Sequence, residues 1–181
     1  MSHLQKSLKL LLLVILFSVV SSCKQNKSSL AEYGSVFEKV VISDQGVFRG
    51  FSLGDSLKNI KAKEKETPKE EDENYLYYEY KSDSLTTFNV SYSFDEKGLN
   101  EIKSDIFVKN NMDVAEDIYN KFKEYFNQHY GQSETEGGFD VWSVKSEKYG
   151  EIRIDLSNEF PAFNTTNAIG KISLWIYPDT N

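Results

Sequence analysis

The chain is poor in the residues that build disulfide frameworks and metal centres, with one cysteine and two histidines among 181 residues. A single cysteine forms neither an internal disulfide nor a thiolate cage for zinc. Glycine-rich phosphate loops, serine nucleophile elbows and the paired histidines of zinc hydrolases are also absent from the sequence. We therefore expect no metal, no cofactor and no catalytic residue, and a fold that packing alone stabilises.

A long hydrophobic run is lacking as well. The apolar run at residues 10–20 is eleven residues long, whereas a membrane-spanning helix needs roughly 20. Lys6 and Lys9 precede it, and small residues follow it up to the single cysteine, Cys23. A basic lead, a short apolar core and small residues are typical of a signal peptide, which we assign to residues 1–22.

The end of this segment, Val20-Ser21-Ser22-Cys23, resembles a bacterial lipobox, in which small residues precede a cysteine that is lipidated. The resemblance implies a lipoprotein whose Cys23 carries acyl chains such as palmitate, and each buried CH₂ contributes about 0.8 kcal/mol to such an anchor. An ordinary cleaved signal peptide, with Cys23 as a free thiol, is the alternative. We expect a lipid-anchored protein of the bacterial cell envelope. Lys24, where an inner-membrane retention signal more often places aspartate, favours the outer membrane, facing the periplasm or the cell surface.

The charge balance excludes one class of partner. The chain has 21 basic and 28 acidic residues. Cleavage before Cys23 would remove only Lys6 and Lys9 from these, which leaves 19 basic residues and a formal charge of −9 over 159 residues. Nucleic acid is therefore not an expected partner, because binding to phosphate backbones needs concentrated lysine and arginine. The membrane, through the lipid, and a protein or envelope component are the expected partners.

The mature chain divides into a spacer and one domain. Residues 23–34 are mostly polar, which is typical of a flexible tether. Residues 35–181 are about the length of one domain.

Six segments alternate apolar and polar residues as half-buried strands do. The clearest is residues 86–94, where Phe88, Val90 and Tyr92 share one side. Short turns between the segments imply antiparallel pairing, since parallel neighbours need crossovers of a dozen or more residues. The six strands are expected at residues 75–80, 86–94, 99–108, 139–145, 151–156 and 169–177.

Two helices are expected, over residues 55–66 with Asp55 as its cap, and over residues 113–130 before Gly131. The second has an apolar stripe that must be buried. Its members are Val114, Ile118, Phe122, Tyr125, Phe126 and His129.

Two further segments complete the expected elements. Residues 36–42 and 47–51 are apolar enough for a short hairpin, and the acidic residues 70–73 are typical of a solvated loop. These acidic residues lack the alternation and the glycine of a calcium loop.

The expected fold is α+β, an antiparallel sheet of about six or more strands with two helices on one face. A helix followed by three strands occurs twice along the chain, which suggests a tandem duplication. The stretches 51–57 (Phe51-Ser52-Leu53-Gly54-Asp55-Ser56-Leu57) and 125–131 (Tyr125-Phe126-Asn127-Gln128-His129-Tyr130-Gly131) resemble pieces of the helix-plus-antiparallel-sheet modules of the outer-membrane assembly lipoprotein family and of the beta-lactamase-inhibitor-protein fold.

Aromatic residues supply the candidate binding site. In strands that alternate, one set of side chains lies under the helices and the other set lies on the uncovered face of the sheet. Tyr75, Tyr77, Trp142, Trp175 and Tyr177 are candidates for that uncovered face, and tyrosine and tryptophan are enriched at binding hot spots. The alternative is that these rings pack against one another or against loops, because the register decides which face each takes.

The function expected from these features is non-catalytic binding. Two alternatives stay open: a hydrolase of envelope or dietary glycans that uses two carboxylates, and an inhibitor or immunity-type protein whose acidity steers it to a basic partner. His129 is expected to stack or cap at its helix end rather than to act in catalysis.

Overall fold

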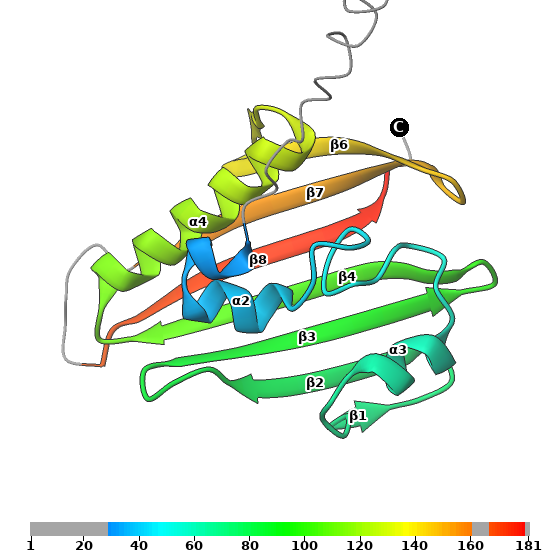
Figure 1. Ribbon diagram of the computed structural model, residues 1–181, viewed down its shortest axis with the longest axis horizontal. Helices are drawn as coiled ribbons and strands as arrows, with labels where there is room; N and C mark the ends of the chain where they lie inside the picture. Colours follow the sequence, from blue (N-terminus) through cyan, green and yellow to red (C-terminus); the bar gives the residue numbers. More distant parts are fainter. Residues whose placement is uncertain (1–28, 161–166, 180–181) are drawn as a thin grey trace, which may run out of the picture.

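The computed structural model describes residues 29–160 and 167–179, so the expected signal peptide and Cys23 lie outside the described residues. One antiparallel sheet of eight strands, in the order β1-β2-β3-β4-β8-β7-β6-β5, carries α-helices on one face (Figure 1). The helices are α2 (Ser35–Val41), α3 (Leu57–Lys63) and α4 (Met112–Tyr130), preceded by the 3-10 turn η1 (Leu30–Tyr33). The strands are β1 (Glu70–Glu71), β2 (Tyr75–Lys81), β3 (Thr86–Asp95), β4 (Gly98–Lys109), β5 (Glu134–Glu136), β6 (Phe139–Ser146), β7 (Gly150–Glu159) and β8 (Ile169–Pro178).

The two halves of the chain meet in the middle of the sheet. Strands β1 to β4 follow α3 and form one antiparallel meander, and β5 to β8 follow α4 and form the other. The last strands of the two meanders, β4 and β8, pair with Lys103 opposite Trp175. The expected α+β class and antiparallel sheet of about six or more strands are confirmed, with eight strands in the described residues. The described residues form three α-helices rather than the expected two.

The two strands that the sequence did not predict are short and lie at the sheet edges. Glu70 and Glu71 form β1 where a solvated loop was expected, and both residues remain exposed. Residues 134–136 form β5 between α4 and the expected strand at residues 139–145. Such edge strands carry too few residues for a visible alternation, and short charged edges are a common protection against unwanted strand pairing.

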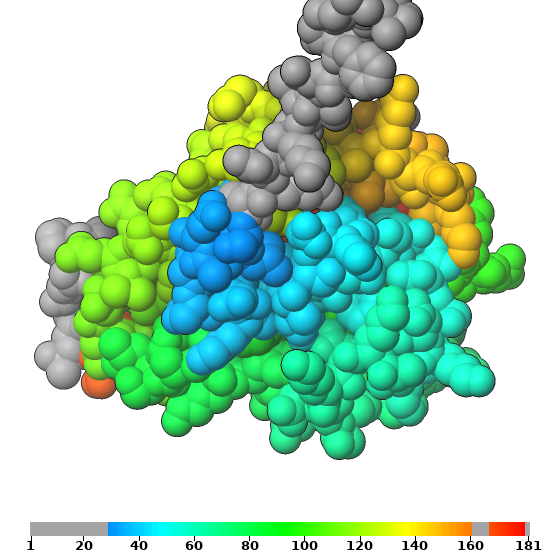
Figure 2. Space-filling model, in the orientation of Figure 1, coloured from blue at the N-terminus to red at the C-terminus, as the bar shows by residue number. Residues whose placement is uncertain are grey.

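The core lies between the sheet and the helices, which together with their connecting loops cover this face (Figure 2). Alternation on β3 sends Phe88, Val90 and Tyr92 into it, as predicted. The stripe of α4 is buried at Ile118, Phe122, Tyr125 and Phe126. Val114, expected in this stripe, is 37% exposed, because its neighbour Ala115 faces the sheet beside Gly170.

The predicted strand at residues 36–42 is wrong, since Ser35–Val41 forms helix α2. Its valines favour a strand by local propensity, but its buried residues Phe37, Val40 and Val41 have the spacing of a helical face. Phe37 packs on α4, with its ring centroid 4.7 Å from that of Phe122. Tertiary packing therefore decides this element, and residues 47–51 form a loop with one isolated bridge, Phe48 to Phe51.

The domain begins earlier than the expected boundary at residue 35. Tyr33, in the C-terminal part of the expected tether, is 5% exposed. Its ring lies edge-on to Tyr125 at 5.5 Å, and its hydroxyl donates to Gln128 over 2.7 Å. Tyr33 is thus packed on α4, whereas Ser29, Ala31, Glu32 and Gly34 around it are exposed.

Candidate functional site

The second face of the sheet, here named the open face, is covered by no helix of the described residues (Figure 1). Directly opposed residues of antiparallel strands point to the same face, so the register defines the rows of this face. One row runs across all eight strands and consists of Glu70, Tyr77, Ser91, Lys103, Trp175, Asp155, Val141 and Glu134.

Two neighbouring strands, β7 and β8, bring four side chains of the open face into one group, here named the Trp175 cluster. Trp175 is opposite Asp155, and Tyr177 is opposite Arg153. The two aromatic rings lie with centroids 4.5 Å apart and planes tilted by 39°. Trp175 is 39% exposed, so the cluster presents a large aromatic surface to solvent.

Hydrogen bonds hold the Trp175 cluster in one arrangement. Arg153 donates through Nε to Oδ1 of Asp155 over 2.7 Å, and the Tyr177 hydroxyl donates to Oδ2 over 2.8 Å. Arg153 also pairs with Glu136 of β5 at 2.6 Å. Burial and the bond to Asp155 raise the pKa of Tyr177 to about 12, and the bond to Asp155 raises the pKa of Arg153 above its usual value. The cluster therefore keeps its hydroxyl and its positive charge at neutral pH.

Two of the predicted binding residues lie on the same face but apart from this cluster. Tyr75 and Tyr77 alternate with the buried Leu76 and Tyr78 on β2. Tyr77 shares a row with Trp175, three strand spacings away, which corresponds to about 14 Å. Four of the five predicted residues thus occupy the open face, in two separate groups.

The prediction for Trp142 is corrected, because this residue is 2% exposed beneath α4. Its ring packs on Phe126 at 5.3 Å, and its indole nitrogen donates to Asn127 and to the carbonyl oxygen of Gly131. The alternation of β6 is visible in the sequence, but which of its two sets faces α4 depends on pairing with β7.

Arg153 and Asp155 are not among the residues that the sequence predicted for the site. Their spacing of two on an alternating strand puts them on one face. Their contact with Tyr177 depends on the pairing of β7 with β8, which has no local signal. The missing information is therefore the register between strands rather than the residue types.

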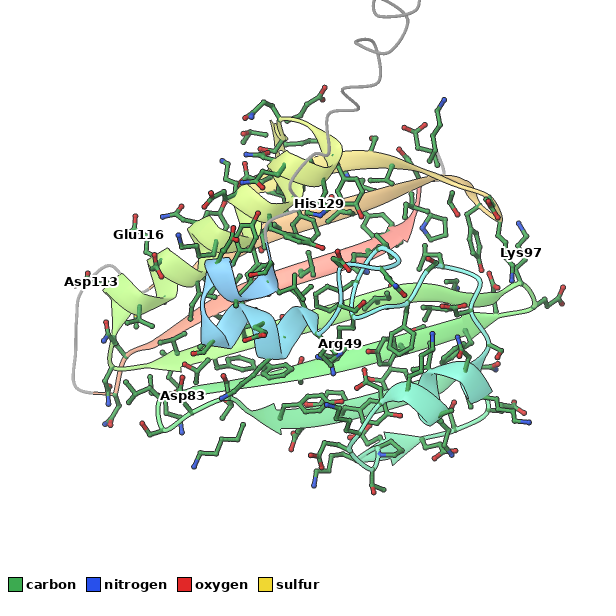
Figure 3. All side chains as sticks on the ribbon, viewed as in Figure 1. Arg49, Asp83, Lys97, Asp113, Glu116 and His129 are labelled. Atoms are coloured by element: carbon green, nitrogen blue, oxygen red, sulfur yellow. The ribbon has the colours of Figure 1, made fainter. Side chains whose placement is uncertain are left out.

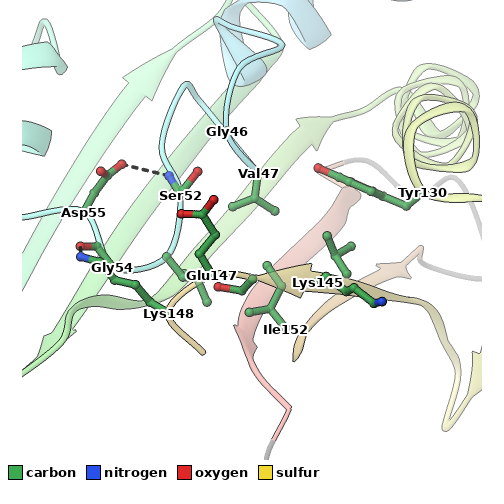
Figure 4. A pocket seen from close by; sticks show the side chains of 13 residues that line it. Gly46, Val47, Ser52, Gly54, Asp55, Tyr130, Lys145, Glu147, Lys148 and Ile152 are labelled. Carbon is green, nitrogen blue, oxygen red and sulfur yellow. Dashed lines mark hydrogen bonds between the residues drawn. The ribbon is translucent and has the colours of Figure 1, made fainter. Parts of the chain in front are cut away.

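A cavity of about 490 Å³ lies on the helix side of the sheet. The loop at residues 46–55, the last residue of α4, Tyr130, and the β6–β7 turn enclose it (Figure 4). Tyr130 is distant in sequence from Glu147 and from the aliphatic residues that line the cavity. No sequence motif predicts that these residues line one cavity.

Two titratable residues outside the Trp175 cluster, Asp105 and His129, are engaged in contacts within the fold. Asp105 accepts a hydrogen bond from Ser173 over 2.6 Å and pairs with Lys171 at 3.6 Å. His129 lies near the C-terminal end of α4 (Figure 3). Its ring centroid is 4.0 Å from that of Tyr125, with the planes tilted by 32°, and its Nδ1 lies 2.8 Å from the Tyr125 carbonyl oxygen. Within residues 29–160 and 167–179, no group of three or more His, Cys, Asp or Glu is placed to hold a metal ion.

Comparisons with protein-family models, with curated proteins and with solved structures gave no match. Among the described residues, no helix is both long and apolar enough to cross a bilayer. Cys23, the expected lipidation site, lies outside those residues.

Proposed function

We propose that this chain is a lipid-anchored protein of the bacterial envelope that acts as a non-catalytic binding module, with the open face as its docking surface for a protein. One observation carries the proposal: Trp175, Tyr177 and Arg153 lie together on a face without helices. These are the three residue types most enriched at hot spots of protein interfaces. Preorganisation by Asp155 lowers the entropy lost when a partner orders them.

The composition of the open face favours a protein over other ligands. Protein interfaces combine an aromatic centre with a polar rim. Around Trp175 the face carries charges of both signs, with Lys103 opposite it on β4 and Glu136 paired to Arg153. Eight strands about 4.8 Å apart span about 34 Å, which gives room for the roughly 800 Å² that a standard interface buries on each partner.

The proposed anchor sets where this face acts. The lipobox-like Val20-Ser21-Ser22-Cys23 and the polar residues after it support a domain tethered close to a membrane surface. The proposed location is the outer membrane, on its periplasmic or cell-surface side. Replacing Cys23 with alanine should release the protein from the membrane fraction and remove incorporation of labelled palmitate; retention of both would refute lipidation at this residue.

The docking surface is tested by cross-linking and affinity purification of the full chain from its own envelope, read by mass spectrometry. Trp175→Ala and Tyr177→Ala should each lose the captured protein. Leu85→Ala removes a side chain of similar exposure, 41%, in the β2–β3 turn and should leave capture unchanged. Circular dichroism and thermal unfolding of each variant show whether it is folded. Equal capture by all three variants, or capture of glycan alone, would refute the proposal.

The net negative charge of the mature chain supports a more specific form of the proposed function, in which the partner is a basic protein and this chain inhibits it. Electrostatic steering makes an association rate fall steeply with ionic strength. An association rate that does not change with salt would leave the binding module but exclude steering by charge. A hydrolase would need two free carboxylates in a cleft, whereas Asp105 and Asp155 are engaged within the open face.

We also infer that the two halves arose by duplication of one helix-plus-sheet unit. Each half contains a helix followed by an antiparallel meander with a short outermost strand, and the sheet order is symmetric about the β4–β8 pair. This arrangement supports the proposed likeness to the modules of the outer-membrane assembly lipoproteins and the beta-lactamase-inhibitor-protein fold.

A further inference from the structure

The cavity at residues 46–55 has an aliphatic lining. Val47, Leu53 and Ile152 are each less than 9% exposed, and Val144 of β6 adds a half-buried side chain. No aromatic ring other than that of Tyr130 lines it. Its volume of about 490 Å³ is within the range of small-molecule sites.

Tyr130 brings an unpaired polar group into this cavity. Its ring stacks on Phe126 with centroids 6.1 Å apart, and its hydroxyl points toward the cavity (Figure 4). Within the described residues this hydroxyl has no hydrogen-bond partner, although burial is deep enough to raise the pKa of Tyr130 above its usual value. This hydroxyl is therefore available to exchange a hydrogen bond with water for one with a ligand.

Glu147 faces Tyr130 from the other side of the cavity (Figure 4). It belongs to the β6–β7 turn, and no ion pair within the described part of the chain engages its carboxylate. Three other charged side chains line the cavity: Asp55 accepts from the backbone N–H of Ser52 over 3.0 Å, Lys148 donates to the carbonyl oxygen of Gly54, and Lys145 is exposed on β6.

The walls are fixed without a ligand. The Lys148 bond ties the β6–β7 turn to the loop, and Gly54 has a φ of +93°, which residues with a side chain rarely adopt. Gly54 also donates its N–H to the carbonyl oxygen of Leu99 over 2.6 Å. A preformed cavity loses little entropy on binding.

From this geometry we propose that the cavity binds a small aliphatic amine. The ammonium group is placed between the Glu147 carboxylate and the Tyr130 hydroxyl, and the carbon chain lies on Val47, Val144 and Ile152. A primary ammonium fits because it donates three hydrogen bonds and carries the charge opposite to that of Glu147. The amine is either a free metabolite or the end of a lysine side chain, since both present the same group.

The test is a titration of the full chain in detergent micelles, followed by the backbone amide resonances of Val47, Val144 and Ile152. The probes are butylammonium, 1-butanol and butyrate, which share length and differ in charge. Butylammonium should shift these resonances until the shift reaches a plateau, whereas butyrate should not shift them. Nα-acetyl-lysine methylamide separates the two sources: saturation by it supports a protein lysine, and saturation by butylammonium alone supports a free amine.

Matched variants locate the interaction. Glu147→Gln should weaken butylammonium binding about tenfold or more and Tyr130→Phe about threefold to tenfold, because a charged and a neutral hydrogen bond are removed. Glu151→Gln, on β7 outside the cavity, should leave the affinity for butylammonium unchanged. Trp175→Ala should also leave this affinity unchanged, which distinguishes the cavity from the open face. No binding, equal binding of the three probes, or equal affinity in Glu147→Gln would each overturn the proposal.

Discussion

Arg49 and Glu64 form a buried ion pair in which two hydrogen bonds, of 2.9 and 2.7 Å, join the guanidinium to the two carboxylate oxygens. Each side chain is 1% exposed. Arg49 also donates to the carbonyl oxygen of Val40 over 2.7 Å, and Glu64 accepts from the hydroxyls of Tyr80 and Tyr92. Val40 belongs to α2, Glu64 directly follows α3, and Tyr80 and Tyr92 lie on β2 and β3. The ion pair therefore connects these four elements beneath the helix layer (Figure 3).

Replacing either partner alone should be strongly destabilising, because the other charge stays buried without compensation. We expect Arg49→Met and Glu64→Gln each to lower the free energy of unfolding in urea by about 3–5 kcal/mol. Lys61→Met breaks the ion pair of Lys61 with Glu71, whose side chains are 39% and 40% exposed, and should cost about 1 kcal/mol or less. Similar losses for buried and exposed pairs would contradict this account.

Stability should decline at both ends of the pH scale. Burial alone would raise the pKa of Glu64, but the hydrogen bonds and charge of Arg49 hold it below its usual value. The unfolded chain then binds more protons, so the contribution of Glu64 is complete above the unfolded value of about 4.3 and is lost as the pH falls through the lower folded pKa. Asp140 acts in the same direction, since the bonds from Lys123 and Tyr119 outweigh its burial.

At alkaline pH the buried tyrosines set the limit. Burial raises the pKa of Tyr78 to about 12 and that of Tyr92 well above its usual value, whereas an unfolded tyrosine ionises near pH 10. The free energy of unfolding should therefore fall as the pH rises above about 10. Urea unfolding from pH 3 to 11 measures both limbs, and Glu64→Gln should flatten the acid limb. An acid limb of unchanged slope in that variant would rule out Glu64 as its source.

Two glycines with left-handed backbones should respond differently to alanine. Gly46 has a φ of +68°, and an added Cβ would lie 2.4 Å from the carbonyl oxygen of Phe51. Gly131 has a φ of +93°, with nothing within 4 Å of its Cβ position. Gly131→Ala should cost only the backbone penalty of roughly 1–3 kcal/mol, whereas Gly46→Ala should cost more and shift the loop. Thermal unfolding of both variants measures the difference, and equal losses would exclude a steric contribution at Gly46.

The parts of the fold that the sequence predicts are those with a long periodic pattern. The alternation at residues 86–94 and the stripe of α4 identify β3 and α4, because one face of each is buried against the other layer. Helix α2 has only seven residues, and its valines favour a strand in isolation. Its packing on Phe122 is a long-range contact that no local pattern contains.

The site was predictable in residue type but not in grouping. The aromatic residues of β2 and β8 were expected on one face, and Tyr75, Tyr77, Trp175 and Tyr177 do lie there. Trp142 takes the opposite face because a shift of one residue in register exchanges the two faces of a strand. The approach of Tyr130 to Glu147 depends on how α4 is seated above the β6–β7 turn, and only the folded chain brings them together.

The two tryptophans should report separately on the core and on the open face. Trp142 is 2% exposed and Trp175 is 39% exposed, so acrylamide should quench Trp175 several times more strongly. Trp175→Phe should leave a blue-shifted emission that resists quenching, and Trp142→Phe should leave an emission that is readily quenched. A partner bound to the open face should then protect the second variant from acrylamide and leave the first unaffected, because only Trp175 lies on the surface that the partner covers. Equal quenching of both variants would contradict the assigned faces, and a bound partner that does not protect Trp175 would place the interface elsewhere.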